Sequence, residues 1–112
     1  MAEGSPAEAA EIAAAVEFAD NGNKGLEMAR ALKPNILITE ILLTGTDGLG
    51  VCKALKSDPE TRSIIVLIFS ILEAEERASE AGADGYLRKP LDDERMVRSV
   101  ERLLKQHRAG GT

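Results

Sequence analysis

The sequence from residue 64 to residue 69 reads Ile64-Ile65-Val66-Leu67-Ile68-Phe69, and this run is the strongest strand signal in the chain. No polar residue interrupts it, and β-branched side chains dominate it. Runs of this kind are typical of central strands in parallel sheets, because helices cover both faces of such sheets. We therefore predict a buried strand at the centre of a parallel sheet.

Downstream of this strand, a helix and a short strand are expected. Ser70 and Glu73 match the capping-box pattern, which predicts a helix from Ser70 to about Ala81. A glycine then ends that helix, and a short strand over 86–87 leads into the turn Lys89-Pro90. A strand, a helix and a strand in this order indicate a crossover between parallel strands.

Upstream of the run, the same alternation continues. Apolar residues at helical spacing predict a helix over 23–32, which Lys33-Pro34 stops. A strand follows over 36–39 and ends at Glu40, and a further helix crosses residues 49–55. Predicted strands and helices therefore alternate on both sides of the central run.

Helices are also predicted toward both ends of the chain. Ser5 opens an alanine-rich helix, and a short alternating strand follows over 16–18. At the other end, Asp92 or Asp93 caps a last helix with a single apolar stripe. The stripe consists of Met96, Val97, Val100, Leu103 and Leu104.

This alternation predicts an α/β fold, a three-layer α/β/α sandwich built on a parallel sheet. We expect one domain over residues 1–112, with flexible tails at 1–4 and 108–112. The apolar content is high enough for one modest core, because hydrophobic residues make up 44% of the chain.

Charge and cysteine content exclude several classes of protein. The formal net charge is -5, which argues against general affinity for nucleic acid or anionic membranes. No apolar run reaches the length of a membrane span, so cytoplasmic residence is expected. Cys52 is the only cysteine, which excludes a disulfide framework and argues against a metal-ligand cluster. At an apolar helical position, it is expected to be a small core residue.

Several short motifs follow one another along most of the chain. They are Ala19-Asp20-Asn21-Gly22, Lys33-Pro34-Asn35-Ile36, Gly45-Thr46-Asp47-Gly48, Ala81-Gly82-Ala83-Asp84-Gly85-Tyr86 and Lys89-Pro90. Their order and spacing resemble those of response-regulator receiver domains from about Val16 to Gln106. The resemblance implies a flavodoxin-like (CheY-like) fold and a place in two-component, phosphorelay signalling.

The resemblance also implies a site at the carboxyl ends of the strands. Working receivers take a phosphoryl group onto an aspartate, with a magnesium ion held by that aspartate and an acidic pair. The matching positions here are Ser70 for the switch hydroxyl, Tyr86 for the aromatic switch, and Lys89 with Pro90 for the lysine turn. The acceptor position holds Glu40, where the family pattern has Asp.

Two departures from the family predict a loss of this chemistry. The extra methylene of Glu40 moves the carboxylate by roughly 1.5 Å, and a misplacement near 1 Å can cost about a hundredfold in rate. The family's first strand and its acidic pair also lack a counterpart, because Glu3, Glu8 and Glu11 lie before or on a helix. We therefore predict that the magnesium site is lost, that there is no cofactor, and that no residue is catalytic.

The leading hypothesis is a degenerate or pseudo-receiver that binds a protein partner and is not an enzyme. Its interaction surface is predicted on the last two helices and the strand between them. The surface residues are Ala74, Arg77, Tyr86, Arg95, Arg98 and Arg102. Strand edges left bare by the missing first strand also predict a homo-oligomer, such as a strand-exchanged dimer.

Alternatives to this hypothesis remain open. The chain could be a phosphorylatable receiver of a two-component system, or a truncated or engineered fragment of a receiver. Glu40 either mimics the phosphorylated state by pairing with Lys89 or is a polar remnant at a decayed site. Ser70 is either a helix N-cap or a switching hydroxyl.

Overall fold

The computed structural model of the protein describes residues 21–111, with side chains as far as residue 106. The chain divides into two compact units, Ala19–Lys89 and Met1–Phe18 with Pro90–Thr112, and each is described by itself. The helix predicted from Ser5, the strand predicted over 16–18 and the comparison with the family's first strand lie outside the described residues. The single domain over the whole chain stays a prediction.

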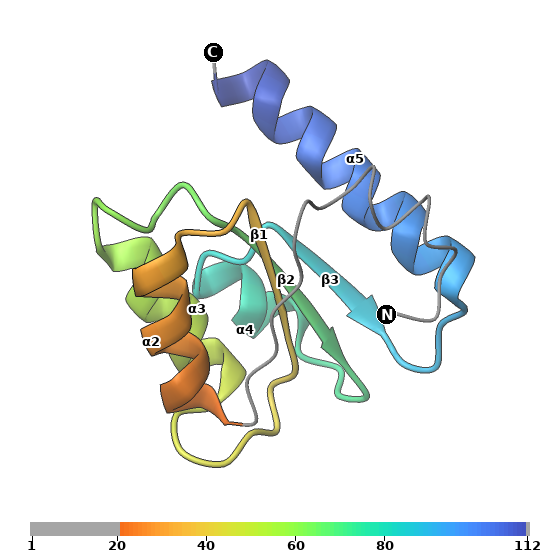
Figure 1. Cartoon of the computed structure of the whole chain (residues 1–112). Coiled ribbons are helices and arrows are strands. Elements are labelled where there is room, and N and C mark those ends of the chain that lie inside the picture. The colour runs from red at the N-terminus through yellow and green to blue at the C-terminus, as the bar shows by residue number, and fades with distance from the viewer. Residues whose placement is uncertain (1–20, 112) are drawn as a thin grey trace. The chain divides into compact units, whose positions relative to one another are not determined.

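The unit Ala19–Lys89 is built on a parallel sheet in the strand order β1-β2-β3 (Figure 1). The strands are β1 (Ile36–Thr39), β2 (Ile65–Ser70) and β3 (Gly85–Arg88). All three were predicted, but β2 begins and ends one residue later than expected, and β3 extends one residue further at each end. The predicted parallel α/β architecture is therefore confirmed.

The central strand β2 is buried on both of its faces. Val66 and Ile68 point to one face and Ile65 and Leu67 to the other, and none of the four is more than 1% exposed. Successive side chains of a strand alternate between faces, so burial of all four requires cover on both sides. This confirms the central position predicted from the unbroken apolar run.

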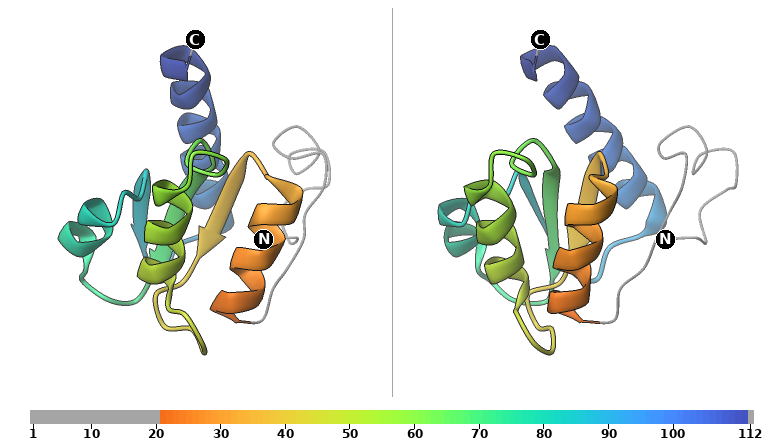
Figure 2. Two further views of the ribbon diagram at one scale, coloured as in Figure 1. Left: turned by 90° about the vertical axis from the view of Figure 1, so that its left-hand side faces the viewer. Right: turned by 60° about the vertical axis from the view of Figure 1, so that its left-hand side comes forward.

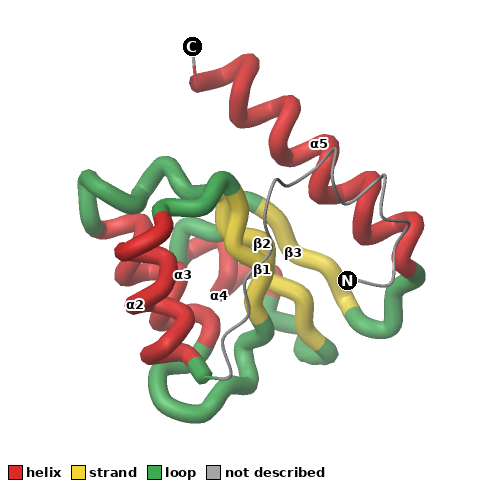
Figure 3. Tube along the Cα trace, viewed as in Figure 1, coloured by secondary structure: helices red, strands yellow, loops and turns green. Residues whose placement is uncertain are grey.

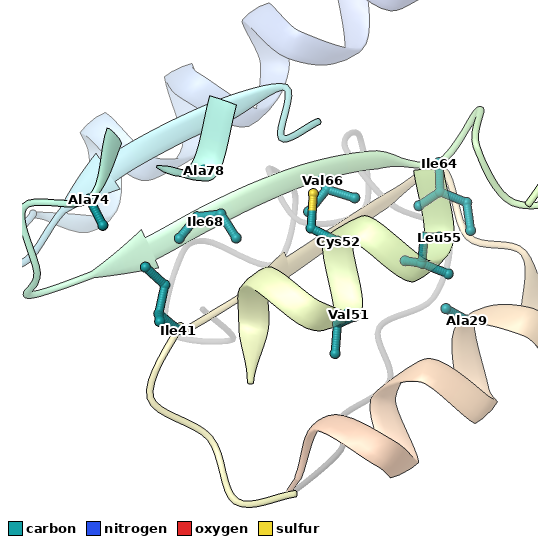
Figure 4. Packing of buried hydrophobic residues seen from close by; sticks show 10 residues of the cluster. All are labelled: Ala29, Ile41, Val51, Cys52, Leu55, Ile64, Val66, Ile68, Ala74 and Ala78. Carbon is teal, nitrogen blue, oxygen red and sulfur yellow. The ribbon is translucent and has the colours of Figure 1, made fainter. Parts of the chain in front are cut away.

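Helices of this unit lie over one face of the sheet (Figure 2). They are α2 (Gly22–Leu32), α3 (Gly48–Ser57) and α4 (Glu75–Glu80), and they alternate with the strands along the chain (Figure 3). The core beneath them consists of small or aliphatic side chains (Figure 4). They are Ala29, Ile41, Val51, Cys52, Leu55, Ile64, Val66, Ile68, Ala74 and Ala78.

Polar residues cap the N-termini of α2 and α3. The Asn21 side chain accepts the Lys24 amide N–H at 2.8 Å and begins α2, and α2 ends at Lys33, whose φ of 48° is left-handed. The Asp47 side chain accepts the Gly50 amide N–H at 2.8 Å and begins α3. These caps satisfy amide groups that have no partner within their own helix.

The helix predicted to begin at Ser70 is wrong in its start. Ser70 is the last residue of β2, and α4 begins only at Glu75, where Ala74 provides no side-chain cap. The Ser70 hydroxyl instead accepts the Leu72 amide N–H at 3.2 Å. The expected end is confirmed, because α4 closes at Ala81 before a glycine with a φ of 97°.

The last helix, α5 (Asp93–Gly111), belongs to the other unit. The Asp92 side chain accepts the Arg95 amide N–H at 2.8 Å, so the predicted cap is confirmed. The predicted stripe is also found, since the buried residues of α5 are Met96, Val100, Leu103 and Leu104, and Val97 is half-buried. The helix α5 extends through residues 108–111, and the flexibility expected of the tail over 108–112 stays a prediction.

No helix in residues 21–111 is both long and apolar enough to cross a membrane.

Cys52 is fully buried, and its thiol donates to the Ala81 carbonyl at 3.4 Å. Burial raises the pKa of the Cys52 thiol to about 11, so the thiol stays protonated at neutral pH. Cys52 is therefore the small core residue that its position predicted.

Lys56 ties the end of α3 to the sheet, a role that the sequence did not indicate. Its ammonium group donates to the Ile64 carbonyl at 2.7 Å and to the Arg62 carbonyl at 3.1 Å. It also pairs with Asp84 Oδ2 at 2.9 Å, and the same oxygen accepts the Val66 amide N–H at 2.8 Å. One lysine thus links α3, the start of β2 and the turn before β3.

Candidate functional site

The carboxyl ends of the three strands bring Glu40, Ser70 and Lys89 together. Glu40 follows β1, Ser70 ends β2, and Lys89 follows β3. The Lys89 Nζ atom lies 3.0 Å from Glu40 Oε1, and the Ser70 hydroxyl donates a hydrogen bond to the same carboxylate. The backbone joins this edge as well, because the Lys89 amide N–H donates to the Ser70 carbonyl at 2.9 Å. The pairing with Lys89 that one of the two alternatives for Glu40 predicts is therefore present.

The second oxygen of the Glu40 carboxylate is held by the backbone that follows it. Glu40 Oε2 accepts the Ile41 amide N–H at 2.8 Å and the Leu42 amide N–H at 3.4 Å. Together with Ser70 and Lys89, these amides surround the carboxylate with hydrogen-bond donors. We call this set of donors, the amides of Ile41 and Leu42 with Ser70 Oγ and Lys89 Nζ, the donor cradle.

The donor cradle favours the charged form of Glu40. Partial burial acts to raise the pKa of Glu40, but hydrogen bonds from Ser70, Lys89, Ile41 and Leu42 outweigh it and hold that pKa below its usual value. The carboxylate is therefore ionised at neutral pH. The side chains of Glu40 and Lys89 are 20% and 38% exposed, and a pair so accessible to water contributes about 0–1 kcal/mol of stability.

A neighbouring aromatic ring also positions the Lys89 ammonium group. Lys89 Nζ lies 5.2 Å from the centre of the Phe69 ring, within the range of a cation–π contact. Phe69 precedes Ser70 on β2, so one short piece of that strand supplies contacts to both Lys89 and Glu40. The ammonium group is therefore held by more than its charge partner.

Tyr86 is connected to the donor cradle through the backbone of Leu72. Its hydroxyl donates to the Leu72 carbonyl, and the Leu72 amide N–H donates to the Ser70 hydroxyl at 3.2 Å. The Tyr86 ring is half-buried and packs against the core beneath the helices. Pro90, which follows Lys89, is exposed. Tyr86 is thus a packed residue whose hydroxyl is hydrogen-bonded to the loop after β2.

Two glycines from the motifs of the sequence, Gly22 and Gly48, allow close approaches that hold the loop after Glu40 in place. A Cβ atom on Gly48 would lie 2.0 Å from the Glu40 carbonyl oxygen, and the Gly48 amide N–H donates to the Ile41 carbonyl at 3.1 Å. A Cβ atom on Gly22 would lie 1.6 Å from the Thr46 carbonyl oxygen. These close approaches fix the backbone that presents the donor amides.

The magnesium ion implied by the family resemblance does not fit the residues around Glu40. Both oxygens of this carboxylate are already engaged by hydrogen-bond donors. Over residues 21–111, no group of three histidine, cysteine or acidic side chains could hold a metal ion. Glu3, Glu8 and Glu11 lie outside the described residues, so the loss of the metal site stays a prediction.

The residues predicted for the interaction surface differ in their exposure. Arg77 on α4 is exposed, as are Arg95, Arg98 and Arg102 on α5. Ala74 is only 6% exposed and packs in the core, so its assignment to a surface is wrong.

Comparisons with known proteins identify the family that shares this fold. A family profile described as "Response regulator receiver domain" matches residues 7–101. "Response regulator PleD" of Caulobacter vibrioides is 35% identical over 108 residues and is matched over 86% of this chain, which spans only 24% of the length of that relative. "Protein PilH" of Pseudomonas aeruginosa is 32% identical over 89 residues, which cover 77% of this chain and 74% of that protein.

A solved structure with a similar sequence has the same fold. The signal receiver domain of a signal transduction histidine kinase from Syntrophus aciditrophicus is 28% identical, with a TM-score of 0.75. The match covers 91% of this chain and 85% of that one. The order of strands and the crossover helices are therefore those of a known fold.

Replacing Gly48 with alanine is expected to displace Glu40. The new methyl group would clash with the Glu40 carbonyl, so Gly48→Ala should lower the free energy of unfolding by about 1–3 kcal/mol. Gly50→Ala, in the same helical turn, is the matched control. Its methyl group would meet no backbone atom, only the side chains of Thr46 at 2.7 Å and Asp47 at 3.5 Å, which can shift. Alanine also gains up to about 1 kcal/mol of helix propensity over glycine. Equal urea midpoints for the two variants would contradict this account.

Proposed function

The chain belongs to the response-regulator receiver domain family of two-component signalling proteins, and we propose that it is a pseudo-receiver that signals by binding a protein partner without phosphoryl transfer. The proposal is carried by one observation. The Glu40 carboxylate, at the position of the family's acceptor, is already bound by Lys89 Nζ at 3.0 Å and by the Ser70 hydroxyl. In the family, those two groups contact the transferred phosphoryl group.

An occupied donor cradle opposes phosphorylation of Glu40 in two ways. A carboxylate oxygen must be free and aligned to attack phosphorus, but the donors around Glu40 engage both of its oxygens. A phosphoryl group that arrived would then compete with the carboxylate for Ser70 and Lys89. Phosphoryl transfer also depends on metal ions that neutralise charge as it develops, and the described residues around Glu40 do not fit such an ion.

Under this proposal, the domain stays in one signalling state. The carboxylate occupies the donors that a phosphoryl group contacts in working receivers, which gain and lose that group. The hydrogen bonds that connect Ser70 through Leu72 to Tyr86 are then always present. Output then depends on the amount of protein and on its partner. We propose that the partner contacts exposed arginines such as Arg77 and Arg98, and that both proteins act in the cytoplasm.

The proposal predicts that the protein does not respond to a phosphoryl analogue. The amide NMR spectrum of the purified protein should remain unchanged when magnesium and beryllofluoride are added together, because the donors are already occupied. Signals from Glu40, Ser70, Tyr86 and Lys89 report on the site directly. Magnesium alone and beryllofluoride alone are the reagent controls.

A response that needs both reagents would overturn the pseudo-receiver assignment. Such shifts would saturate at the four site residues and would identify a phosphorylatable receiver, the rival function. Lys89→Met provides the matched variant, since a true phosphoryl site loses a main contact with this change. Shifts that persist in Lys89→Met would reflect binding elsewhere and would leave the pseudo-receiver in place.

We also propose that the protein forms a homo-oligomer through a strand edge. Among residues 21–111, β1 has β2 as its only strand partner, and Ile38 on β1 is 37% exposed. An accessible strand edge with an apolar side chain favours pairing with a second chain. Sedimentation at micromolar concentration should show a dimer, and Ile38→Lys should shift it toward monomer. A strictly monomeric wild-type protein would contradict the proposal.

A further inference from the structure

The site around Glu40 resembles a binding site that already holds its ligand. The carboxylate accepts the Ile41 and Leu42 amides at 2.8 and 3.4 Å, the Lys89 ammonium group at 3.0 Å, and the Ser70 hydroxyl. We propose that the donor cradle is a carboxylate-binding site and that the side chain of Glu40 is its tethered ligand. This inference rests on the proposed function and adds the chemical class of ligand that the site selects.

The donors are positioned by groups other than the Glu40 carboxylate. The Ser70 side chain is fully buried and also accepts the Leu72 amide N–H at 3.2 Å. Lys89 is held over the Phe69 ring at 5.2 Å. The close approach of Gly48 to the backbone of residue 40 fixes the loop that carries the amides. Removal of the carboxylate should therefore leave the donors arranged and without an acceptor.

The charge of the donor cradle matches a carboxylate better than a phosphoryl group. Its one cationic contact in the described part of the chain is Lys89, which balances the single charge of Glu40. A phosphate ester carries about -1.5 to -2 charges at neutral pH, so it would need a second cation. A carboxylate also has two oxygens, and here one meets the lysine while the other meets the amides.

Tethering explains why the wild-type protein should ignore carboxylates in solution. A ligand attached to its own site acts at an effective concentration of about millimolar or more, and free ligand must exceed this to compete. The tether also sets the size of the ligand that could replace it. Truncation of Glu40 to alanine removes a group the size of acetate, and truncation to glycine removes one the size of propionate.

The test is the response of truncated variants to small carboxylates. In Glu40→Ala, acetate should restore the wild-type amide shifts of Ile41, Leu42 and Ser70 and should raise the melting temperature. In Glu40→Gly, propionate should do so more effectively than acetate. Sodium chloride at equal ionic strength is the salt control, and the wild-type protein should respond to none of these additions.

Two further comparisons test the chemistry of the site. Acetamide has the shape of acetate without its charge, and it should bind about tenfold more weakly, because hydrogen bonds to charged groups are the stronger ones. Glu40→Ala combined with Lys89→Met should lose the response to acetate. If Glu40→Ala fails to fold, the glycine variant with propionate provides the same test.

Several outcomes would overturn the inference. They are a folded truncated variant that ignores carboxylates, equal effects of acetamide and acetate, and phosphate that binds more tightly than acetate. The failure of the proposed function would look different, because it would be a response of the wild-type protein to magnesium with beryllofluoride. The two hypotheses can therefore fail separately.

Discussion

The site depends on the 3.0 Å contact between Glu40 Oε1 and Lys89 Nζ. Glu40 follows β1 and Lys89 follows β3, so this contact spans the central strand between them. A parallel sheet delivers the carboxyl ends of all its strands to one edge, which is why residues so distant in sequence meet. The burial of β2 on both faces fixes that edge, and the apolar core therefore determines where the charges lie.

The balance of forces at Glu40 explains how a charged carboxylate persists at this edge. Partial burial disfavours its charge, while donors from Ser70, Lys89 and the amides of Ile41 and Leu42 favour it and prevail. Because water reaches the pair, the contact adds little to stability. Under the proposed function, the consequence of the contact is specificity, because an internal ligand fills the acceptor position and engages the groups that would contact a phosphoryl group.

Much of the fold was predictable from local pattern, whereas the contacts of the site were not. The bounds of β1 follow from a short apolar run between Pro34 and Glu40, and both predicted and observed strands cover Ile36–Thr39. The helix start predicted at Ser70 was wrong because a capping box is a local pattern, while the Ser70 hydroxyl donates to Glu40, far away in sequence. Lys56 could not be identified, because its role depends on carbonyls that only the folded chain brings within reach.

The most direct test of a bound Glu40 carboxylate is its titration, followed by carbon-13 NMR of the side-chain carboxyl group. In the folded wild-type protein its pKa should lie below the usual value of about 4.3 for glutamate, and it should rise in Lys89→Met. Because the pKa of Glu40 is lower in the folded state, its charged form stabilises the fold at pH values above the usual pKa. This contribution is lost as the pH falls through the lowered pKa. A pKa at the usual value, unchanged in Lys89→Met, would contradict the account.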